Sequence, residues 1–299
     1  MILIDAFGGD YAPLEIVKGV SECIRKCHCD ISLVGNRNKI NQVARDNNLI
    51  VDDLKIIDCE NEITGSDDPM EIIKSKKESS MAVGLSYLSQ GKADLFISAG
   101  NSGALLVGTN MIVKRAPGIR RIAFAPIIPK LQGHFLLLDA GANAQCTPEI
   151  LYQFAIMGSD YYKKLKKIDN PKVALLNIGS EEHKGDSLRK ETYQLLKSSN
   201  ELNFIGNMEP PEILTGDCDV VVADGFSGNI FVKSIEGTIK VFANLLKSSI
   251  SGPFEHTYLN RKKFAQESFS VLLGASAHVI KLHSSIKSSS LCEFIMSLN

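Results

Sequence analysis

Short apolar runs alternate with amphipathic stretches along the first part of the chain. Runs of strand length lie at residues 2–5, 31–34, 54–57 and 94–98. Between the first two, apolar residues recur at helical spacing after Pro13, which is suited to the first turn of a helix. This alternation predicts βαβ units and a parallel sheet with helices on both faces.

The same pattern continues in the second part of the chain. Further strands are expected at residues 135–139, 173–178, 203–206 and 219–224, and further helices at 102–112, after Thr147-Pro148-Glu149 and from Asn229 to about Ser249. We therefore expect a three-layer α/β/α fold with a mostly parallel sheet. We expect residues 1–299 to form one domain, with a protruding helical segment at about 229–268.

Four apolar runs stop at a cluster of Gly, Asn and Asp and restart as a helix. These stretches are residues 96–104, 137–143, 175–186 and 220–229. Each predicts a buried strand that leads through a tight loop to a helix N-terminus, where unpaired N–H groups and the helix dipole favour an anion. Gathered along one sheet edge, such loops predict a pocket for a phosphate-bearing or acyl-transfer substrate.

Composition narrows the class of protein. A net charge of -1 over 299 residues argues against a broad nucleic-acid surface. The apolar runs are of strand length, well short of the roughly 18 to 20 residues that a spanning helix needs. The first residues, Met1-Ile-Leu-Ile-Asp5, lack the basic and long apolar regions of a secretory leader. We therefore expect a cytoplasmic protein.

The seven cysteines suggest reduced thiols rather than a disulfide framework. One cluster, Cys23, Cys27, His28 and Cys29, raises the hypothesis of a zinc site. Structural zinc sites usually take paired ligands from two separate places, and no second Cys or His pair is found elsewhere. We therefore predict no metal, and interpret the cluster as buried or half-buried thiols at a helix end.

Familiar phosphate and hydrolase motifs are missing. The sequence has no Gly-x-x-x-x-Gly-Lys-Ser/Thr, and no Gly-x-Gly-x-x-Gly follows its first strand. The segment Gly225-Phe-Ser-Gly228 is similar to a nucleophile elbow, but Asn229 stands where Gly is required. Nothing in the sequence nominates the His and acid of a catalytic triad.

Two side chains of the third loop have candidate roles. Lys184 lies between Glu181-Glu182 and a helix start at Gly185-Asp186, where it would hold a phosphate and stabilise an oxyanion, or else be a solvated surface lysine. His183 is a candidate general base or an exposed loop residue.

The fourth loop and the strand ends offer other polar groups. Asn229 would donate its amide to a thioester oxygen, or cap the following helix. Aspartates at strand ends or turns would hold Mg²⁺ or, as we expect for most of them, fix loop amides; they are Asp5, Asp139, Asp217, Asp219 and Asp224.

With these residues identified, the chain resembles the bacterial phosphate acyltransferase family of phospholipid synthesis over essentially its whole length. The motifs that carry the resemblance are Asp5-Ala-Phe-Gly-Gly-Asp-Tyr-Ala-Pro13, Ser98-Ala-Gly-Asn-Ser-Gly-Ala-Leu105, Leu138-Asp-Ala-Gly-Ala-Asn143, Gln153-Phe-Ala-Ile-Met-Gly158, Leu176-Asn-Ile-Gly-Ser-Glu-Glu-His-Lys-Gly185, Asn203-Phe-Ile-Gly-Asn207, Asp224-Gly-Phe-Ser-Gly-Asn229, Leu272-Leu-Gly274 and His283-Ser-Ser285.

The resemblance implies a fold similar to isopropylmalate dehydrogenase and phosphotransacetylase, a homodimer and no redox cofactor. It implies that the protein converts long-chain acyl-acyl-carrier protein and inorganic phosphate to acyl-phosphate and free carrier protein. The product would feed glycerol-3-phosphate acylation, which suggests contact with the membrane glycerol-3-phosphate acyltransferase and a peripheral position at the inner face of the membrane.

The resemblance also assigns site residues. Lys184 would anchor the phosphate and Asn229 would hold the thioester carbonyl or its oxyanion, whereas the family motif does not require His183. Substrate or phosphate binding is implied for Asp5, Gly8, Gly9, Asp10, Asn101, Ser102, Gly103, Asp139, Asn143, Asn177, Gly179, Glu182, Gly185, Asp224 and Gly228.

The chain departs from the family pattern at three places. Tyr11 replaces the usual Asn, residues 269–271 replace Gly-Ala-Pro, and the region 242–268 is shorter than usual. In the family this region reaches toward the membrane and the dimer partner. A stripe of Phe242, Leu245, Leu246 and Ile250 would therefore face a membrane or, as we expect, the partner subunit.

Three alternatives to this function stay open at the level of sequence. A phosphotransacetylase acting on acyl-coenzyme A would share the anion pocket. A decarboxylating dehydrogenase on the same architecture would need a nicotinamide site and a divalent metal. A non-enzymatic scaffold would bind carrier protein and the membrane acyltransferase without using Lys184.

Overall fold

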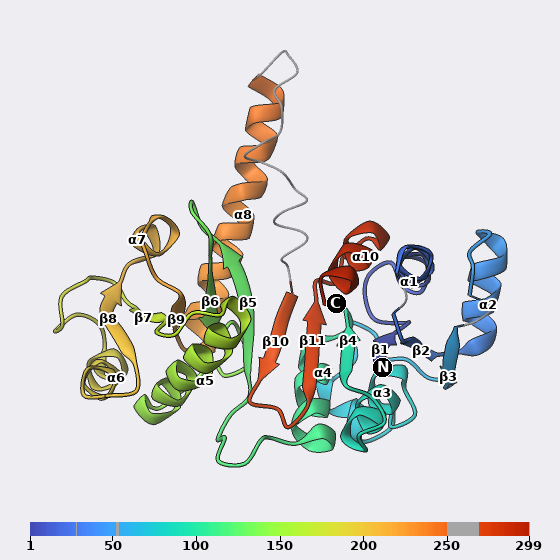
Figure 1. The fold of residues 1–299 in the computed structure, drawn as a ribbon, viewed down its shortest axis with the longest axis horizontal. Coiled ribbons are helices and arrows are strands. Elements are labelled where there is room, and N and C mark those ends of the chain that lie inside the picture. The colour runs from blue at the N-terminus through green and yellow to red at the C-terminus, as the bar shows by residue number, and fades with distance from the viewer. Residues whose placement is uncertain (28, 52–53, 250–268, 299) are drawn as a thin grey trace. The chain divides into compact units, whose positions relative to one another are not determined.

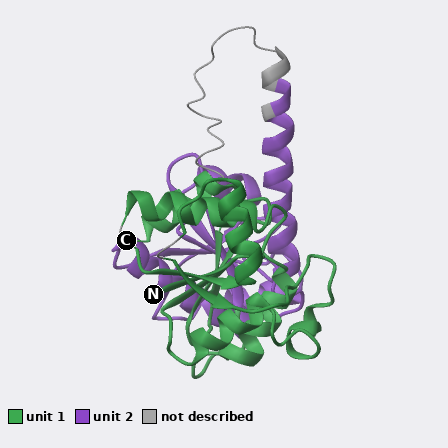
Figure 2. Ribbon diagram, turned by 90° about the vertical axis from the view of Figure 1, so that its right-hand side faces the viewer, with its two compact units in different colours: residues 1–122, 268–299 green, residues 123–267 purple. Residues whose placement is uncertain are grey.

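The computed structural model describes residues 1–27, 29–51, 54–249 and 269–298. The chain divides into two compact units, residues 1–122 with 268–299 (unit 1) and residues 123–267 (unit 2), which are coloured separately in Figure 2. Each unit is described by itself. The division into two units does not test the expectation that residues 1–299 form one domain, which stays a prediction.

Unit 1 is built on a mostly parallel sheet. Its strand order is β3-β2-β1-β4-β11-β10, in which β10 alone runs antiparallel to its neighbour β11. The strands are β1 (Ile2–Asp5), β2 (Ile31–Gly35), β3 (Lys55–Asp58), β4 (Leu95–Ser98), β10 (Phe269–Leu273) and β11 (His278–Leu282). Every residue of β2 is buried, as is typical of a parallel strand covered on both faces.

Helices cover this sheet (Figure 1). They are α1 (Leu14–Lys26), α2 (Arg37–Asp46), α3 (Ser80–Ser89), α4 (Ser102–Gly108) and α10 (Ser288–Ser297), with a 3₁₀ turn η1 (Pro69–Ile73) and a π-helical segment η2 (Thr109–Val113). The segment Asp67-Asp68-Pro69, whose sequence favours a helix start, leads only to the short 3₁₀ element η1. The predicted buried helix at 102–112 divides in two, and Met111 on its second part is 59% exposed.

Unit 2 repeats this arrangement on a second group of strands. Its order is β5-β6-β9-β7-β8, parallel throughout except that β5 runs antiparallel to β6. The strands are β5 (Ala123–Pro129), β6 (His134–Leu138), β7 (Lys172–Leu176), β8 (Asn203–Met208) and β9 (Val220–Val222). The apolar side chains of β6 and β9 are buried and form the core beneath the helices.

The helices of unit 2 are α5 (Pro148–Lys166), α6 (Ser187–Lys197), α7 (Pro210–Thr215) and α8 (Gly225–Ser249). The α5 helix begins as predicted, with Pro148 in its first turn. However, α8 begins at Gly225, four residues before Asn229, and Asp224 accepts a hydrogen bond from the Ser227 N–H at its start. The alternative that Asn229 caps this helix is therefore wrong.

The first turns of α8 pack on the unit 2 core through Phe231, and its later turns extend away from the unit 2 sheet (Figure 1). Phe242 and Leu245 of the predicted stripe are 57% and 54% exposed. Ile250 lies outside the described residues, as does the side chain of Leu246. In the part of the chain that the structure describes, no helix combines the length and apolar character needed to cross a membrane.

Candidate functional site

Three of the four predicted loops lie at one edge of the unit 2 sheet. Strands β6, β9 and β7 are adjacent and parallel, so the segments that follow them leave the sheet at the same edge. The segment after β9 lies between the other two because β9 is the middle strand. The order of the strands therefore places Asn229, on α8, between the Asp139 loop and the Lys184 loop.

Asp139 organises the loop that follows β6. Its Oδ1 accepts backbone N–H groups from Phe124 at 2.9 Å and from Gly141 and Ala142 at 3.1 Å. Its Oδ2 accepts the backbone N–H of Asn143 at 2.6 Å and the Asn143 side-chain amide at 2.9 Å. Burial raises the pKa of this carboxyl, and the donated hydrogen bonds oppose the rise. These donors support a role for Asp139 in fixing loop amides.

The base of α8 rests directly on this loop. A Cβ on Gly228 would overlap the backbone carbonyl of Asp139, and one on Gly225 would lie 2.8 Å from the backbone of Asn143. The Gly225 N–H also donates to the Asn143 carbonyl at 2.8 Å. Both glycines are needed because backbone meets backbone here with no room for a side chain.

Asn229 presents its amide beside the same loop. Gly141 has φ +137, and a Cβ placed on it would lie 3.3 Å from Asn229 Nδ2. The Asn229 side chain is exposed, so a ligand approaching from solvent can contact it. The backbone N–H groups of this loop are taken up by Asp139, so the accessible Asn229 amide is the donor here that suits the stabilisation of an oxyanion.

The loop after β7 holds the backbone of Lys184 in a fixed position. The Asn177 amide donates to the Lys184 carbonyl at 3.2 Å, and the Lys184 N–H donates to the Glu181 carbonyl at 3.1 Å. The Asn207 amide donates to that same Glu181 carbonyl at 2.9 Å. Side-chain amides from two strand ends therefore determine where the lysine leaves the loop.

The Lys184 side chain is held loosely by comparison. Its stem passes Gly179, where a Cβ would lie 2.8 Å from Lys184 Cγ. Its Nζ is 3.8 Å from Glu181 Oε1, and the side chain is 41% exposed. The next residue, Gly185, has φ +89 and turns the chain toward α6. The ammonium is therefore positioned on a defined loop while staying accessible to a solute anion.

Arg189 is a site residue that sequence reasoning missed. Its guanidinium pairs with Asp224, donates to Ser227 Oγ at 2.8 Å and pairs with Asp186 at 3.0 Å. The side chains of Arg189 and Asp224 are only 13% and 6% exposed. The pair joins the start of α6 to the start of α8, and so joins the Lys184 loop to the helix that carries Asn229. No local pattern signals it, because the partners are 35 residues apart.

Glu182 and His183 contribute less to this arrangement. The Glu182 carboxylate accepts Gln194 Nε2 and Lys197 Nζ, both at 2.8 Å, and these contacts with α6 hold the pKa of Glu182 below its ordinary value. His183 is exposed beside them. The phosphate-binding role implied for Glu182 stays a prediction, with no support from these contacts.

Unit 1 brings together a second set of predicted residues at the ends of β1 and β4. Asp5 is buried and accepts Ser80 Oγ at 2.6 Å, Ser98 Oγ at 2.7 Å and the Phe7 N–H at 3.2 Å. Burial raises the pKa of Asp5, and these donors together with the charge of Lys281 oppose the rise. Ser80 and Lys281 were not singled out in the sequence, and Ser98 appeared there only as the first residue of a family motif.

The remaining unit 1 candidates shape the loops that follow β1 and β4. Gly8 allows close approach, since a Cβ there would lie 2.7 Å from both Asp5 Oδ2 and the Gly100 nitrogen. Gly9 has φ +115, and Asp10 accepts Ser284 Oγ at 3.0 Å. These contacts order the segment after β1.

Asn101 caps α4 through its Oδ1, and its amide donates to the carbonyls of Thr64 and Asp67 at 3.2 and 3.1 Å. Ser102 is exposed at the first position of α4, and Gly103 packs against Pro69. Substrate binding by these three residues stays a prediction.

Comparison with solved structures defines the class of fold. The chain is similar to a phosphotransacetylase from Streptococcus pyogenes, with a TM-score of 0.68 and 17% identity over 99% of this chain and 92% of that one. It is also similar to a branched-chain phosphotransacylase from Enterococcus faecalis, with a TM-score of 0.62 and 16% identity over 99% and 97% of the two chains. The protein therefore has the α/β fold of the phosphotransacetylases, as predicted.

Sequence comparison then defines the family. A family model described as "Fatty acid synthesis protein" matches residues 1–296. The phosphate acyltransferase of Thermoanaerobacterium thermosaccharolyticum is 43% identical over 96% of this chain and 88% of its own length, and that of Listeria welshimeri is 41% identical over 95% and 87%. The chain belongs to this phosphate acyltransferase family, which confirms the resemblance noted in its sequence.

Proposed function

We propose that the protein transfers the acyl group of acyl-acyl-carrier protein to inorganic phosphate, giving acyl-phosphate and free carrier protein. The single observation that carries the proposal is the pairing of two accessible groups on neighbouring segments of one sheet edge. These are the Lys184 ammonium on its amide-braced loop and the Asn229 amide beside Gly141. Membership of the phosphate acyltransferase family supports the same reaction.

In this reaction, Lys184 binds the phosphate and orients one of its oxygens toward the thioester carbon. Phosphate at neutral pH is already an anionic nucleophile, so positioning it replaces the activation that a catalytic triad supplies. A new C–O bond forms, the C–S bond of the thioester breaks, and the proton that the phosphate loses passes through water to the thiolate that leaves.

Asn229 donates its amide to the thioester oxygen, which gains negative charge as the tetrahedral intermediate forms. An amide aligned before the reaction needs no reorganisation at that moment, which is why a fixed donor is effective. Gly228, Gly141 and the hydrogen bonds to Asp139 hold the base of α8 on its loop. We also propose that the residues implied in unit 1, at the ends of β1 and β4, bind substrate.

We further propose that the protein acts as a cytoplasmic homodimer, peripheral at the inner face of the membrane. Acyl-phosphate is hydrolytically reactive, so an enzyme that transfers its acyl group to glycerol 3-phosphate would use it best at short range. The exposed Phe242 on α8 supports a dimer or membrane contact. No redox cofactor takes part in the proposed chemistry.

The test is phosphate-dependent release of thiol from long-chain acyl-acyl-carrier protein. We expect the wild-type chain to release one thiol per acyl-phosphate formed, and Lys184→Ala to lose about 10²- to 10³-fold in rate. Lys190→Ala is a matched control, since it removes an exposed lysine from the nearby helix α6. Equal rates for wild type and Lys184→Ala would overturn the assignment of Lys184, and no phosphate-dependent thiol release by either protein would favour a binding scaffold.

A second candidate function is that of a phosphotransacetylase, which the shared fold favours. The two functions differ in the carrier of the acyl group, so the assay should compare long-chain acyl-carrier protein with short-chain acyl-coenzyme A. A higher kcat/KM for the coenzyme A substrate would replace the first proposal with the second.

A further inference from the structure

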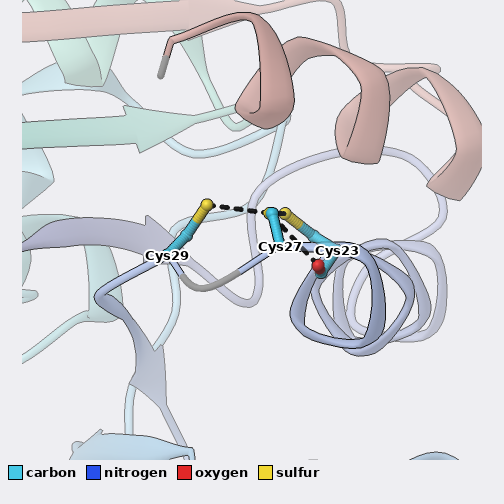
Figure 3. A group of neighbouring side chains, drawn as sticks. All are labelled: Cys23, Cys27 and Cys29. Atoms are coloured by element: carbon cyan, nitrogen blue, oxygen red, sulfur yellow. Dashed lines mark hydrogen bonds between the residues drawn. The ribbon is translucent and has the colours of Figure 1, made fainter.

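Three cysteine thiols converge at the end of α1, in unit 1, and none of them is among the residues assigned to the reaction. Figure 3 shows Cys23 and Cys27 at the end of α1 and Cys29 on the segment that leads to β2, with their sulfurs directed toward one another. The Cys23 and Cys27 sulfurs are 3.3 Å apart, and those of Cys27 and Cys29 are 2.9 Å apart. All three sulfurs lie within 4.8 Å of one another.

A fourth thiol comes from the other end of the chain. Helix α10 packs on α1, so that a Cβ on Gly19 would lie 2.8 Å from the Ser288 carbonyl. One turn further along each helix, Cys23 of α1 and Cys292 of α10 are both buried. The sequence argued against a metal because no second ligand-bearing segment was visible, and α10 supplies that segment.

We propose that Cys23, Cys27 and Cys29, together with Cys292, bind one Zn²⁺ that ties α1 to α10. Thiolates are the preferred ligands of structural zinc, and the ligands here come from one local group and one distant helix, as in other structural sites. His28 lies outside the described residues and is not needed for this ligand set.

The spacing of the Cys23, Cys27 and Cys29 sulfurs fits this ion after a small adjustment, whereas Cys292 lies outside this group and its side chain must turn from Met296 to complete the ligand set. Tetrahedral coordination with Zn–S bonds near 2.3 Å separates the sulfurs by about 3.8 Å, so the contacts at 2.9 and 3.3 Å must open by roughly 0.5 to 1 Å. Cys27 and Cys29 are half-buried, which leaves an approach for the ion, and Cys23 is fully buried.

The charges around the cluster also favour a cation. The end of α1 carries partial negative charge on its last carbonyls, which attracts a positive ion. Each thiol releases its proton to water on binding, so four thiolates and Zn²⁺ leave a local charge of −2. Lys26, in the last turn of α1, pairs with Glu22 at 2.6 Å, so these two charges offset each other rather than the thiolates.

The full-length chain tests this proposal directly. Purified under reducing conditions without chelator, it should contain about one zinc per chain by mass spectrometry. After removal of zinc, Co²⁺ should add one equivalent with a thiolate-to-cobalt charge-transfer band. Added zinc should then displace the cobalt and raise the melting temperature, because it binds the folded state.

Single substitutions assign the ligands. Cys27→Ser and Cys29→Ser should weaken zinc binding by more than about 100-fold, since even changes to groups behind a ligand cost 10- to 100-fold. Cys292→Ser should shift the cobalt bands as oxygen replaces one sulfur. Cys59→Ser is the matched control, a half-buried thiol of the same unit outside the cluster, and should bind zinc as the wild type does.

Three results would overturn the proposal. These are substoichiometric zinc with no cobalt charge-transfer band, unchanged affinity in both Cys27→Ser and Cys29→Ser, and a disulfide between two of the three cysteines in the protein as isolated. Circular dichroism of each variant separates loss of zinc from loss of fold. Metal content and spectra do not depend on acyl transfer, so the inference stands or falls independently of the proposed function.

Discussion

Arg189 and Asp224 form a largely buried ion pair that joins the first turn of α6 to the start of α8. Removing one partner of such a pair leaves the other charge buried and uncompensated. We therefore expect Arg189→Ala to lower the free energy of unfolding by about 3 to 5 kcal/mol, measured by urea denaturation.

Two further variants isolate this effect. Lys190→Ala changes the neighbouring exposed residue and should shift stability by less than about 0.5 kcal/mol. Asp224→Asn keeps a side chain that can cap α8 but removes the charge, so the double variant with Arg189→Ala should recover part of the loss. Additive losses in the double variant would show that the two charges are not coupled.

Asn229 should matter for the chemical step rather than for phosphate binding. We expect Asn229→Ala to lower kcat by about 10²- to 10³-fold with little change in the KM for phosphate, because the amide acts on charge that develops in the transition state. Asn229→Asp should be at least as impaired, since its carboxylate would repel an oxyanion. A rise in the KM for phosphate at constant kcat would instead assign Asn229 to phosphate binding.

Gly228 permits α8 to rest on the backbone of Asp139, so a larger residue there should force the helix away. We expect Gly228→Ala to destabilise the protein by about 1 to 3 kcal/mol, as overpacking does elsewhere. Gly237→Ala, on the same helix, is the matched control because a Cβ there meets nothing within 4 Å. The Gly237→Ala substitution should raise the free energy of unfolding by about 0.4 to 1 kcal/mol, because it lowers the conformational entropy of the unfolded chain. Similar losses at both positions would indicate that helix geometry, not contact with Asp139, is responsible.

Asp5 should make stability depend on pH. Burial raises its pKa, so between the ordinary carboxyl value near 4 and the raised value the folded protein keeps a proton that the unfolded chain has lost. The stabilising contribution of protonated Asp5 is therefore fully present below the ordinary pKa, and it is lost as pH rises through the raised pKa of the folded protein.

Asp5→Asn should remove this dependence, because the Ser80 and Ser98 hydroxyls can rotate to pair with an amide. The comparison is urea unfolding of both proteins across this range of pH. We expect the stability of the variant relative to wild type to increase with pH. A constant difference would contradict a raised pKa.

The sequence predicted most of the strands and three of the loops at the unit 2 edge because strand length and helix starts are local properties, but it did not predict β10 and β11. It placed the start of α8 too late, since Asp224-Gly225 read as loop although Asp224 accepts the Ser227 N–H at the helix start. It could not find Arg189, whose partner Asp224 is distant in sequence and is brought close only by packing. The catalytic roles of Lys184 and Asn229 came from the resemblance and stay predictions.

Because Gly228 contacts the backbone of Asp139, α8 would pivot about its first turns. At about 1.5 Å per residue, the 25 residues of this helix span roughly 37 Å, and the contact lies in its first turns. A tilt of about 5° at Gly228 would therefore displace the far end by roughly 3 Å. A disturbance at the far end would reach Asn229 as a much smaller movement, so the Asn229 amide is mechanically shielded from whatever that end contacts.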